Sequence, residues 1–343
     1  MQTIIVTGGA GYLGSHTIIE LLEKTAYRVV SIDNYSNSRA KTYERIEAIT
    51  KKSVDILEFD LCDAGLLGKN LKPYKHIAGI IHFAAFKSVP ESMAHPTRYY
   101  HNNIASLVNL QEYSKNNGIS NLIFSSSCSV YGNASELPVT EDTPLQKAES
   151  PYGHSKQVGE EMLGFFCRAN PAFNAVLLRY FNPVGAHMSG LNGEVPLRKP
   201  DNLVPIITQT AVGKNSLTVF GNDYPTRDGY CIRDYIHVTD IVDAHLKALD
   251  YLVEHRNKTN LSLFNLGTGR GVSVLEVIRA FEKVSGKKLH YKVGPRREGD
   301  VVAVYANSDR ARTELGWVPK FGLEDMMSSA WKWQLRLEEE DKR

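Results

Sequence analysis

Tyr152 and Lys156 are the side chains in this sequence with the clearest capacity for acid–base chemistry. They lie four residues apart in a segment that starts with Ser150 and Pro151, a pair typical of a helix N-terminus, so a helix would place both on one face. A phenol with a pKa near ~10 becomes a useful base only where positive charge favours its ionised form, and the Lys156 ammonium could supply that charge. We therefore interpret Tyr152 as a candidate general base.

Ser127 is a third candidate for this chemistry. It lies in the serine-rich segment Ser125–Ser129, which directly follows the apolar run Asn121–Phe124, and its hydroxyl could hydrogen-bond to a reacting oxygen. The Tyr-x-x-x-Lys spacing alone is weak, because about two matches of tyrosine to a basic residue are expected by chance among 17 tyrosines and 40 lysines and arginines. The pair therefore gains weight only if the surrounding elements build a binding site.

The N-terminal segment supplies such a context. An apolar run at residues 4–6 leads into a glycine-rich turn at 7–14 and then a helix-like segment at 15–23. A strand, a glycine turn and a helix in this order let the backbone approach a pyrophosphate at the helix N-terminus, as in dinucleotide sites. The spacing can be read in two ways, as Gly9-x-Gly11-x-x-Gly14 or as Gly8-x-x-Gly11-x-x-Gly14.

Asp33 completes the dinucleotide pattern. It closes the next expected strand, 19 residues after Gly14. Its carboxylate would accept hydrogen bonds from the adenosine ribose and repel a 2′-phosphate, which favours NAD over NADP. With an oxidised nicotinamide nearby, Tyr152 could take a proton from a sugar hydroxyl while hydride leaves the same carbon. Lys156 would then tune the phenol and hold the nicotinamide ribose.

Strands and helices alternate through the first half of the chain, which predicts an α/β fold with a doubly wound parallel sheet of Rossmann type. Past Asn182 six prolines and glycines fall within 18 residues and the alternation fades. We expect an NAD-binding domain over residues 1–181 and a smaller substrate-binding α/β domain over 182–343, with later elements such as 261–266 returning to the first sheet. The expected strands are 28–33, 54–59, 79–83, 121–124 and 175–180, and the expected helices include 41–50, 63–71, 97–117, 203–212, 238–255, 273–285 and 323–334.

Composition excludes several classes of protein. The 40 basic and 38 acidic residues leave a net charge of +2, which gives no electrostatic case for nucleic acid or an anionic membrane. The four cysteines are far apart, and zinc-type spacing is absent among the 11 histidines, so we expect a reduced cytoplasmic chain without a metal. No apolar stretch approaches 18 residues, and we expect neither a signal peptide nor a membrane span.

With these motifs the chain resembles the extended short-chain dehydrogenase/reductase family of NAD-dependent epimerases and dehydratases, and within it the nucleotide-sugar 4-epimerases. The resemblance covers nearly the whole length. The shared segments are 7–16, Asp33-Asn34, 82–87, the set of Ser127, Tyr152 and Lys156, and the segments 178–186, 220–224, 233–238 and 296–300.

The resemblance implies a division of the site residues between cofactor and substrate. The implied NAD-binding residues are Gly8, Gly11, Tyr12, Leu13, Gly14, Asp33, Asn34, Asp60, Leu61, Phe83, Ala84, Lys87, Asn102, Tyr152, Lys156 and Phe181. The implied substrate-binding residues are Lys87, Ser127, Tyr152, Asn182, Asn202, Leu203, Phe220, Arg233, Tyr235, Arg297, Asp300 and Val304. Arginine forks suit a diphosphate, and Asp300 and the amides suit the ribose and uracil edges.

The implied activity is reversible interconversion of UDP-galactose and UDP-glucose through a bound 4-keto sugar that turns over in the site. Family members carry either a bulky tyrosine or a small residue four positions after Asp300, and here the residue is Val304. The smaller side chain would leave room beside C2, so we expect UDP-GalNAc and UDP-GlcNAc to be interconverted as well. The resemblance also implies a homodimer that pairs helices at 97–117 and 153–167.

Three other functions remain as alternatives. Another nucleotide-sugar epimerase is one possibility within the family, and a 4,6-dehydratase is a second, although dehydratases follow the fifth strand with Thr-Asp-Glu and this chain has Ser127-Cys128-Ser129. A non-catalytic, NAD-responsive binding protein would need only the glycine pattern. The intact pair of Tyr152 and Lys156 counts against that reading.

Overall fold

The main layer of the molecule is a parallel sheet of seven strands. A computed structural model describes residues 1–198, 200–297 and 300–342. The strands pair in the order β10-β6-β5-β4-β1-β2-β3, and each neighbouring pair is parallel. They are β1 (Thr3–Thr7), β2 (Arg28–Asp33), β3 (Asp55–Glu58), β4 (Ile77–His82), β5 (Asn121–Ser127), β6 (Asn174–Tyr180) and β10 (Leu261–Leu266).

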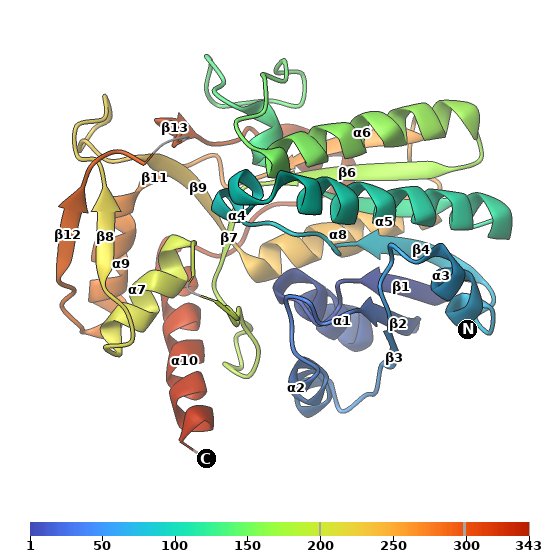
Figure 1. The fold of residues 1–343 in the computed structure, drawn as a ribbon, viewed down its shortest axis with the longest axis horizontal. Coiled ribbons are helices and arrows are strands. Elements are labelled where there is room, and N and C mark those ends of the chain that lie inside the picture. The colour runs from blue at the N-terminus through green and yellow to red at the C-terminus, as the bar shows by residue number, and fades with distance from the viewer. Residues whose placement is uncertain (199, 298–299, 343) are drawn as a thin grey trace.

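Helices cover both faces of this sheet, as a doubly wound fold requires (Figure 1). On one face lie α1 (Tyr12–Lys24), α2 (Lys41–Thr50) and α8 (Val238–Val253). The other face carries α3 (Ala64–Leu71), α4 (Val89–Ala94), α5 (Pro96–Asn117) and α6 (Pro151–Ala169), and a 3₁₀ turn at Cys128–Tyr131 follows β5. The predicted fold class is confirmed, and the expected bounds of β2 and α2 coincide with the observed ones.

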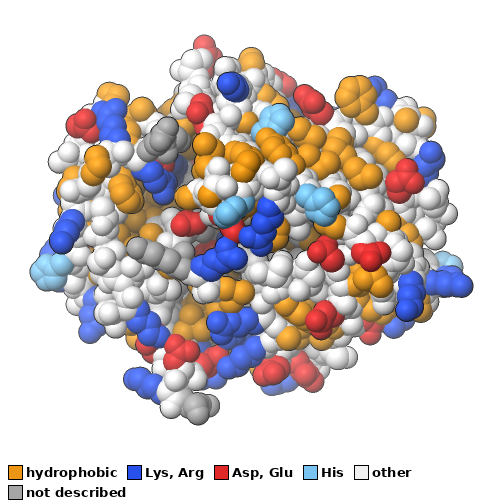
Figure 2. Space-filling view, viewed as in Figure 1, with side chains coloured by type: hydrophobic (Ala, Val, Ile, Leu, Met, Phe, Trp, Pro, Cys, Tyr) orange, Lys and Arg blue, Asp and Glu red, His pale blue; other side chains and the backbone are white. Residues whose placement is uncertain are grey.

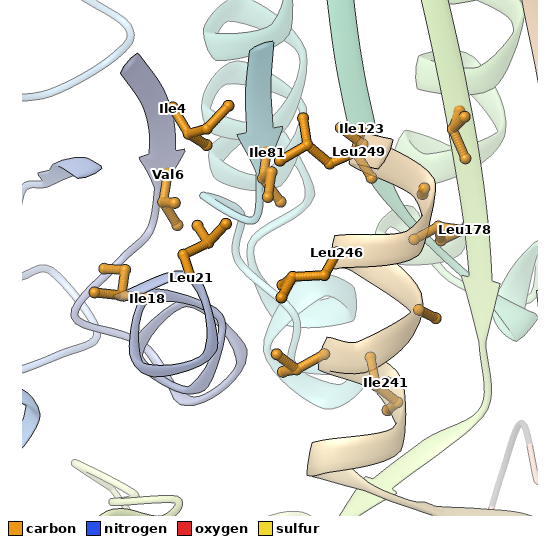
Figure 3. Packing of buried hydrophobic residues seen from close by; sticks show 14 of the residues in the cluster. Ile4, Val6, Ile18, Leu21, Ile81, Ile123, Leu178, Ile241, Leu246 and Leu249 are labelled. Atoms are coloured by element: carbon orange, nitrogen blue, oxygen red, sulfur yellow. The ribbon is translucent and has the colours of Figure 1, made fainter. Parts of the chain in front are cut away.

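Alternating strand residues build the two halves of the core. Ile4 and Val6 of β1 pack with α1 and α8, whereas Ile5 between them packs with residues of α3 and α5. Figure 3 shows the first half, with side chains of β1, β4, β5 and β6 facing those of α1 and α8. Successive side chains of a strand point to opposite faces of the sheet, and both faces are buried here. The strand sequences are therefore nearly continuous apolar runs.

The second, smaller unit is built on short strands and three helices. The strand β9 (Ile232–His237) pairs with β7 (Asn182–Val184), β11 (Gly271–Ser273) and β13 (Ala303–Val304), and β8 (Leu217–Phe220) pairs with β12 (Tyr291–Gly294). Its separate core includes Ile207, Phe281 and Met327. The helices are α7 (Leu203–Ala211), α9 (Val274–Ser285) and α10 (Leu323–Asp341), with a short π-helical turn at Ala311–Leu315 before α10.

The chain passes back from the second unit into the first. After β9 it forms α8, whose residues Ile241 and Leu249 lie in the core of the large sheet, and then β10, which pairs with β6 at the sheet edge. The expectation that residues 261–266 return to the first sheet is confirmed. Within the described ranges of the chain, no helix is long and apolar enough to cross a membrane.

Candidate active site

A cavity of about 660 Å³ lies at the carboxyl ends of the parallel strands, where open α/β sheets bind ligands. The ends of β1, β2, β4, β5 and β6 each contribute wall residues. The structure places most of the predicted residues on this wall: Gly8, Gly11, Tyr12, Leu13, Gly14, Asp33, Asn34, Asp60, Leu61, Phe83, Ala84, Lys87, Asn102, Ser127, Tyr152, Lys156, Phe181, Asn182 and Asn202. All predicted cofactor residues are therefore brought together.

The glycine turn between β1 and α1 brings bare backbone to the cavity. Gly8 has φ of +69°, a left-handed conformation that glycine adopts without strain, and a Cβ on Gly14 would overlap the carbonyl oxygen of Gly8. Gly11 occupies the N-cap of α1. Since the first amides of a helix point out of its N-terminus, this turn has the shape and polarity that a pyrophosphate requires.

Asp33 lies beside this turn and has few open hydrogen-bonding positions. One carboxylate oxygen accepts the amide of Ala10 at 2.9 Å, and the other accepts the amide of Tyr35 at 2.9 Å and the hydroxyl of Ser38 at 2.7 Å. The carboxylate thus braces the glycine turn as well as facing the cavity. Because each carboxylate oxygen has two lone pairs, capacity for ribose hydroxyls remains.

Tyr152 and Ser127 meet where α6 begins beside the end of β5. Ser150 caps α6 by accepting the amide of Gly153 at 3.2 Å, and Pro151 occupies the first turn, as predicted. Burial raises the pKa of Tyr152 to about 12, and the Ser127 hydroxyl partly offsets this by lowering it. The phenol of Tyr152 is therefore protonated at neutral pH when only the protein's own groups act on it.

The Lys156 ammonium has its hydrogen-bond partner on the strand that precedes the catalytic candidates. Its ammonium donates to the carbonyl oxygen of Ser125 at 2.7 Å and lies 4.9 Å from the centre of the Phe124 ring. Burial lowers the pKa of Lys156 to about 8, and the charge of Glu160 opposes that shift. The ammonium is therefore anchored to β5, while burial accounts for the raised pKa of Tyr152.

The predicted nucleotide-binding residues form a second cluster next to the cavity. Asp300 accepts from Arg297 at 2.8 Å and from Arg233 at 3.4 Å, and the Arg297 guanidinium lies 5.8 Å from the centre of the Phe220 ring. Tyr235 pairs with the wall residue Asn182 across β9 and β7. The charge of Arg233 also lowers the pKa of the Cys128 thiol on the cavity wall, although burial raises that pKa overall.

Seven predicted substrate residues are not on the cavity wall itself. Leu203 packs on the core of the second unit at the start of α7, and Val304 belongs to a buried cluster with the wall residue Phe181, Val139 and Ala306. The others are Phe220, Arg233, Tyr235, Arg297 and Asp300. Residues 298–299 of the predicted segment 296–300 lie outside the described residues.

A loop that the sequence motifs did not identify lines the cavity opposite the strand ends. Glu194 of this loop accepts from Lys87 at 2.7 Å and from Asn202 at 3.3 Å, and Asp201 accepts from Ser88 at 2.6 Å. The density of proline and glycine after β6 was the available signal, because such loops at strand ends carry ligand contacts. Other wall residues that were not predicted are Ser36, Ser38, Arg39, Thr42 and Arg45.

In the described segments no group of three or more histidines, cysteines, aspartates or glutamates could hold a metal ion. The cysteines Cys62, Cys128, Cys167 and Cys231 are free thiols.

Known proteins match this chain over nearly its whole length. A model of the family described as GDP-mannose 4,6 dehydratase matches residues 5–330. UDP-glucose 4-epimerase of Homo sapiens is 47% identical over 340 residues, which are 97% of this chain and 96% of that protein. The structure of UDP-glucose 4-epimerase from Bifidobacterium longum in complex with NAD+ and UDP has a TM-score of 0.92, 45% identity and 98% coverage of both chains.

A second solved structure agrees with the first. UDP-glucose-4-epimerase from Stenotrophomonas maltophila, with bound NAD and formylated UDP-arabinopyranose, has a TM-score of 0.94 and 40% identity, and the match covers 99% of this chain and 100% of that one. Matches of this length and identity extend through both units and include the cavity. The chain belongs to the NAD-dependent epimerase/dehydratase family of extended short-chain dehydrogenases/reductases.

Proposed function

We propose that the protein is an NAD-dependent UDP-glucose 4-epimerase, which interconverts UDP-galactose and UDP-glucose. One observation carries the proposal: Tyr152, Ser127 and Lys156 line the same cavity as the glycine turn and Asp33. A dinucleotide laid along that wall would reach from the turn toward the phenol. The named relatives, which match over the whole length, support the same activity.

The cofactor site fits NAD. The backbone at Gly8, Gly11 and Gly14, which lines the cavity, would receive the pyrophosphate, and Asp33 would receive the adenosine ribose. Bound NAD would supply the acceptor and later the donor of the hydride. Its positive nicotinamide would also favour ionisation of Tyr152, which the protein's own groups leave protonated. The remaining residues proposed for this site are Tyr12, Leu13, Asn34, Asp60, Leu61, Phe83, Ala84, Lys87, Asn102, Lys156 and Phe181.

The proton of the sugar 4-hydroxyl is the part of the reaction that the chain's own residues move. Ser127 would hold the 4-oxygen, and Tyr152 would take its proton and later return it. The resulting 4-keto sugar must turn over before reduction from its other face. This requires firm contacts to the nucleotide and few to the hexose. We propose Phe220, Arg233, Tyr235, Arg297 and Asp300 for the nucleotide, with Asn182, Asn202 and Leu203 nearby.

The experiment that tests the function is an assay with UDP-galactose and purified enzyme. We expect UDP-glucose to form, and the Tyr152→Phe variant to lose about 10²–10⁴-fold in rate while it still binds NAD. A parent-like rate in Tyr152→Phe would contradict the assignment of the base, and the absence of UDP-glucose from the parent reaction would contradict the function. Formation of a 4-keto-6-deoxy sugar would instead identify a 4,6-dehydratase, which the acid-free segment Ser127–Ser129 disfavours.

We also propose activity on the acetylated pair, UDP-GalNAc and UDP-GlcNAc. Val304 is a small side chain in the same buried cluster as Phe181, and Phe181 lines the cavity. A larger residue at 304 would press Phe181 into the cavity, whereas valine leaves that wall free to accommodate an N-acetyl group. The support is this packing together with the family pattern at the position.

We propose further that the protein works as a homodimer in the cytoplasm. Hydrophobic side chains gather over α5 and α6 in Figure 2, and Phe165 and Met93 are 65% and 61% exposed. Val108 of α5 and Val89 of α4 are exposed as well. A second copy could cover this surface by helix pairing. The free thiols suit a reducing compartment.

The proposed units of the chain remain 1–181 and 182–343, with β10 and α8 added to the first.

A further inference from the structure

The hydroxyl of Ser127 makes hydrogen bonds within its own loop besides lining the cavity. Ser127 ends β5 and occupies the N-cap of the 3₁₀ turn Cys128–Tyr131. Its Oγ accepts the backbone amide of Ser129 at 3.2 Å and the hydroxyl of Ser129 at 3.0 Å. A serine hydroxyl has two lone pairs and one proton. Both lone pairs of Ser127 are therefore engaged by Ser129, and the proton is left for another partner.

Ser129 is itself held against the first turns of α6. A Cβ added to Gly153 would lie 3.2 Å from the carbonyl oxygen of Ser129, so the two backbones are close. The next residue, Val130, is fully buried, and its carbonyl oxygen accepts the side-chain amide of Gln157 of α6 at 2.8 Å. Ser129 is thus fixed beside the start of the helix that carries Tyr152, and both residues line the same cavity.

The direction of the hydrogen bonds at Ser127 matters for the proposed reaction. The proton of the sugar 4-hydroxyl must pass to Tyr152, but a serine hydroxyl with a free lone pair could accept the same proton and turn it away from the phenol. With its lone pairs engaged, Ser127 can approach the 4-oxygen only as a donor. Such a bond becomes stronger as negative charge develops on that oxygen, so it favours the transition state over the bound substrate.

We propose that Ser129 is a positioning residue that orients the Ser127 hydroxyl. Its amide and hydroxyl engage the lone pairs of Ser127, so that Ser127 donates to the sugar 4-oxygen and the 4-hydroxyl proton is directed to Tyr152. The inference rests on the proposed epimerase function and adds a residue to the same site. Ser129 acts through Ser127, and the proton transfer itself remains between the sugar and Tyr152.

The test compares three replacements of Ser129 in the turnover of UDP-galactose by the NAD-bound enzyme. Ser129→Ala removes the hydroxyl donor, and Ser129→Cys keeps a similar shape with a weak donor. In both we expect kcat to fall about tenfold, the effect of losing one hydrogen bond, while KM stays within about threefold of the parent value. Ser129→Thr retains the hydroxyl, so its kcat should stay within about threefold of the parent value. If Ser129→Ala does not fold, Ser129→Cys carries the same comparison.

The matched control is the same change in a Ser127→Ala background, measured in single turnovers with excess enzyme. Because Ser129 acts through Ser127, Ser129→Ala should cause no further loss there, so the two changes are not additive. A further loss of about tenfold in that background would overturn the inference, since Ser129 would then act on the sugar or on the fold by itself. A parent-like kcat in Ser129→Ala and Ser129→Cys, or in Ser127→Ala, would overturn it as well. An inactive parent would instead refute the proposed function.

Discussion

Glu340, near the end of α10, accepts a hydrogen bond from Arg45 of α2 across 2.8 Å. Lys41 pairs with the same carboxylate at 2.9 Å, and the Arg45 guanidinium lies 4.8 Å from the centre of the Trp333 ring. Arg45 also lines the cavity. The last helix of the second unit is therefore tied to the cofactor-binding unit beside the proposed adenosine end of NAD.

Breaking this tie should speed the release of NAD. For Glu340→Gln we expect about tenfold faster loss, because a charge-assisted hydrogen bond contributes about 1.5–3 kcal/mol and 1.4 kcal/mol corresponds to a factor of ten. The measurement is the NAD that remains with the protein after successive rounds of gel filtration. Glu338→Gln is the control, since Glu338 pairs with Lys214 within the second unit at 2.8 Å. Equal retention by both variants would contradict the prediction.

Gly14→Ala should weaken NAD binding severely. The added Cβ would overlap the carbonyl oxygen of Gly8, so the turn that receives the pyrophosphate must move. We expect at least a hundredfold loss in NAD affinity, which corresponds to about 2.7 kcal/mol, measured by isothermal titration. Gly68→Ala on α3 provides the control, because a Cβ there meets no described atom within 4 Å and the helix gains about 0.5–1 kcal/mol. NAD affinity that is equal in the two variants would refute this role of Gly14.

Buried histidines should make the fold sensitive to mild acid. Burial lowers the pKa to about 3 for His16 and His82 and to about 4 for His237 and His245. Between pH 6.5 and these values the unfolded chain binds protons that the native state does not, so stability falls as the pH is lowered below about 6.5. When the pH falls from 7.5 to 5.5, each of these histidines lowers the free energy of unfolding by about 1.3 kcal/mol.

The measurement for the histidines is urea unfolding at pH 7.5 and 5.5. In His245→Gln the difference in unfolding free energy between pH 7.5 and pH 5.5 should be about 1.3 kcal/mol smaller than in the parent. In His290→Gln, where the replaced side chain is exposed, this difference should equal that of the parent. Because the replacement can lower overall stability, only the difference between the two pH values is compared. An unchanged pH difference in His245→Gln would show that this histidine does not contribute.

Val304→Tyr should narrow the substrate range. The tyrosine would crowd the cluster that contains Phe181 and press on the cavity wall. We expect the ratio of UDP-GalNAc to UDP-galactose turnover to fall at least tenfold, with the UDP-galactose rate within about threefold of the parent. Val304→Ala is the control for altered packing, because it removes side-chain volume from the same cluster instead of adding it. A ratio that does not change in Val304→Tyr would end the proposal of dual specificity.

Phe165→Asp should prevent self-association. Phe165 is the most exposed of the large hydrophobic side chains on the surface formed by Val89, Met93, Val108 and Phe165, and a carboxylate buried there would oppose contact between two copies. We expect sedimentation to show a dimer for the parent and a monomer for the variant. Val293→Asp on β12 is the control, because it places the same charge on an exposed valine far along the second unit. A monomeric parent would refute the dimer.

Sequence periodicity predicted the elements of the large sheet because burial on two faces imposes apolar runs on its strands. Arg28–Asp33 and Lys41–Thr50 were predicted with the observed bounds, and the glycine pattern correctly indicated which strand end and helix N-terminus face the cavity. The short strands of the second unit were not predicted. A strand of three residues such as Asn182–Val184 is too short to show a period, and its pairing with β9 depends on residues more than fifty positions away.

The surroundings of the proposed catalytic pair could not be predicted from spacing. Tyr152 and Lys156 share a helix face, but the ammonium donates to the carbonyl oxygen of Ser125 on β5. This partner comes from another element, so the surroundings of the ammonium are known only from the tertiary structure. Arg45 is a second example. It lies in the correctly predicted helix α2, but only the packing of α10 against this helix shows which of its sides faces the cavity.

The return of α8 and β10 to the large sheet restricts how this protein can be divided or recombined. A fragment that ends at residue 181 would lack the strand that covers the edge of β6 and the helix that contributes Ile241 and Leu249 to the core. Exposed strand edges and apolar faces promote aggregation, so such a fragment should not be stable when expressed alone. A chimaera that takes its second unit from a relative would therefore need at least two junctions in the chain, one on either side of residues 238–266.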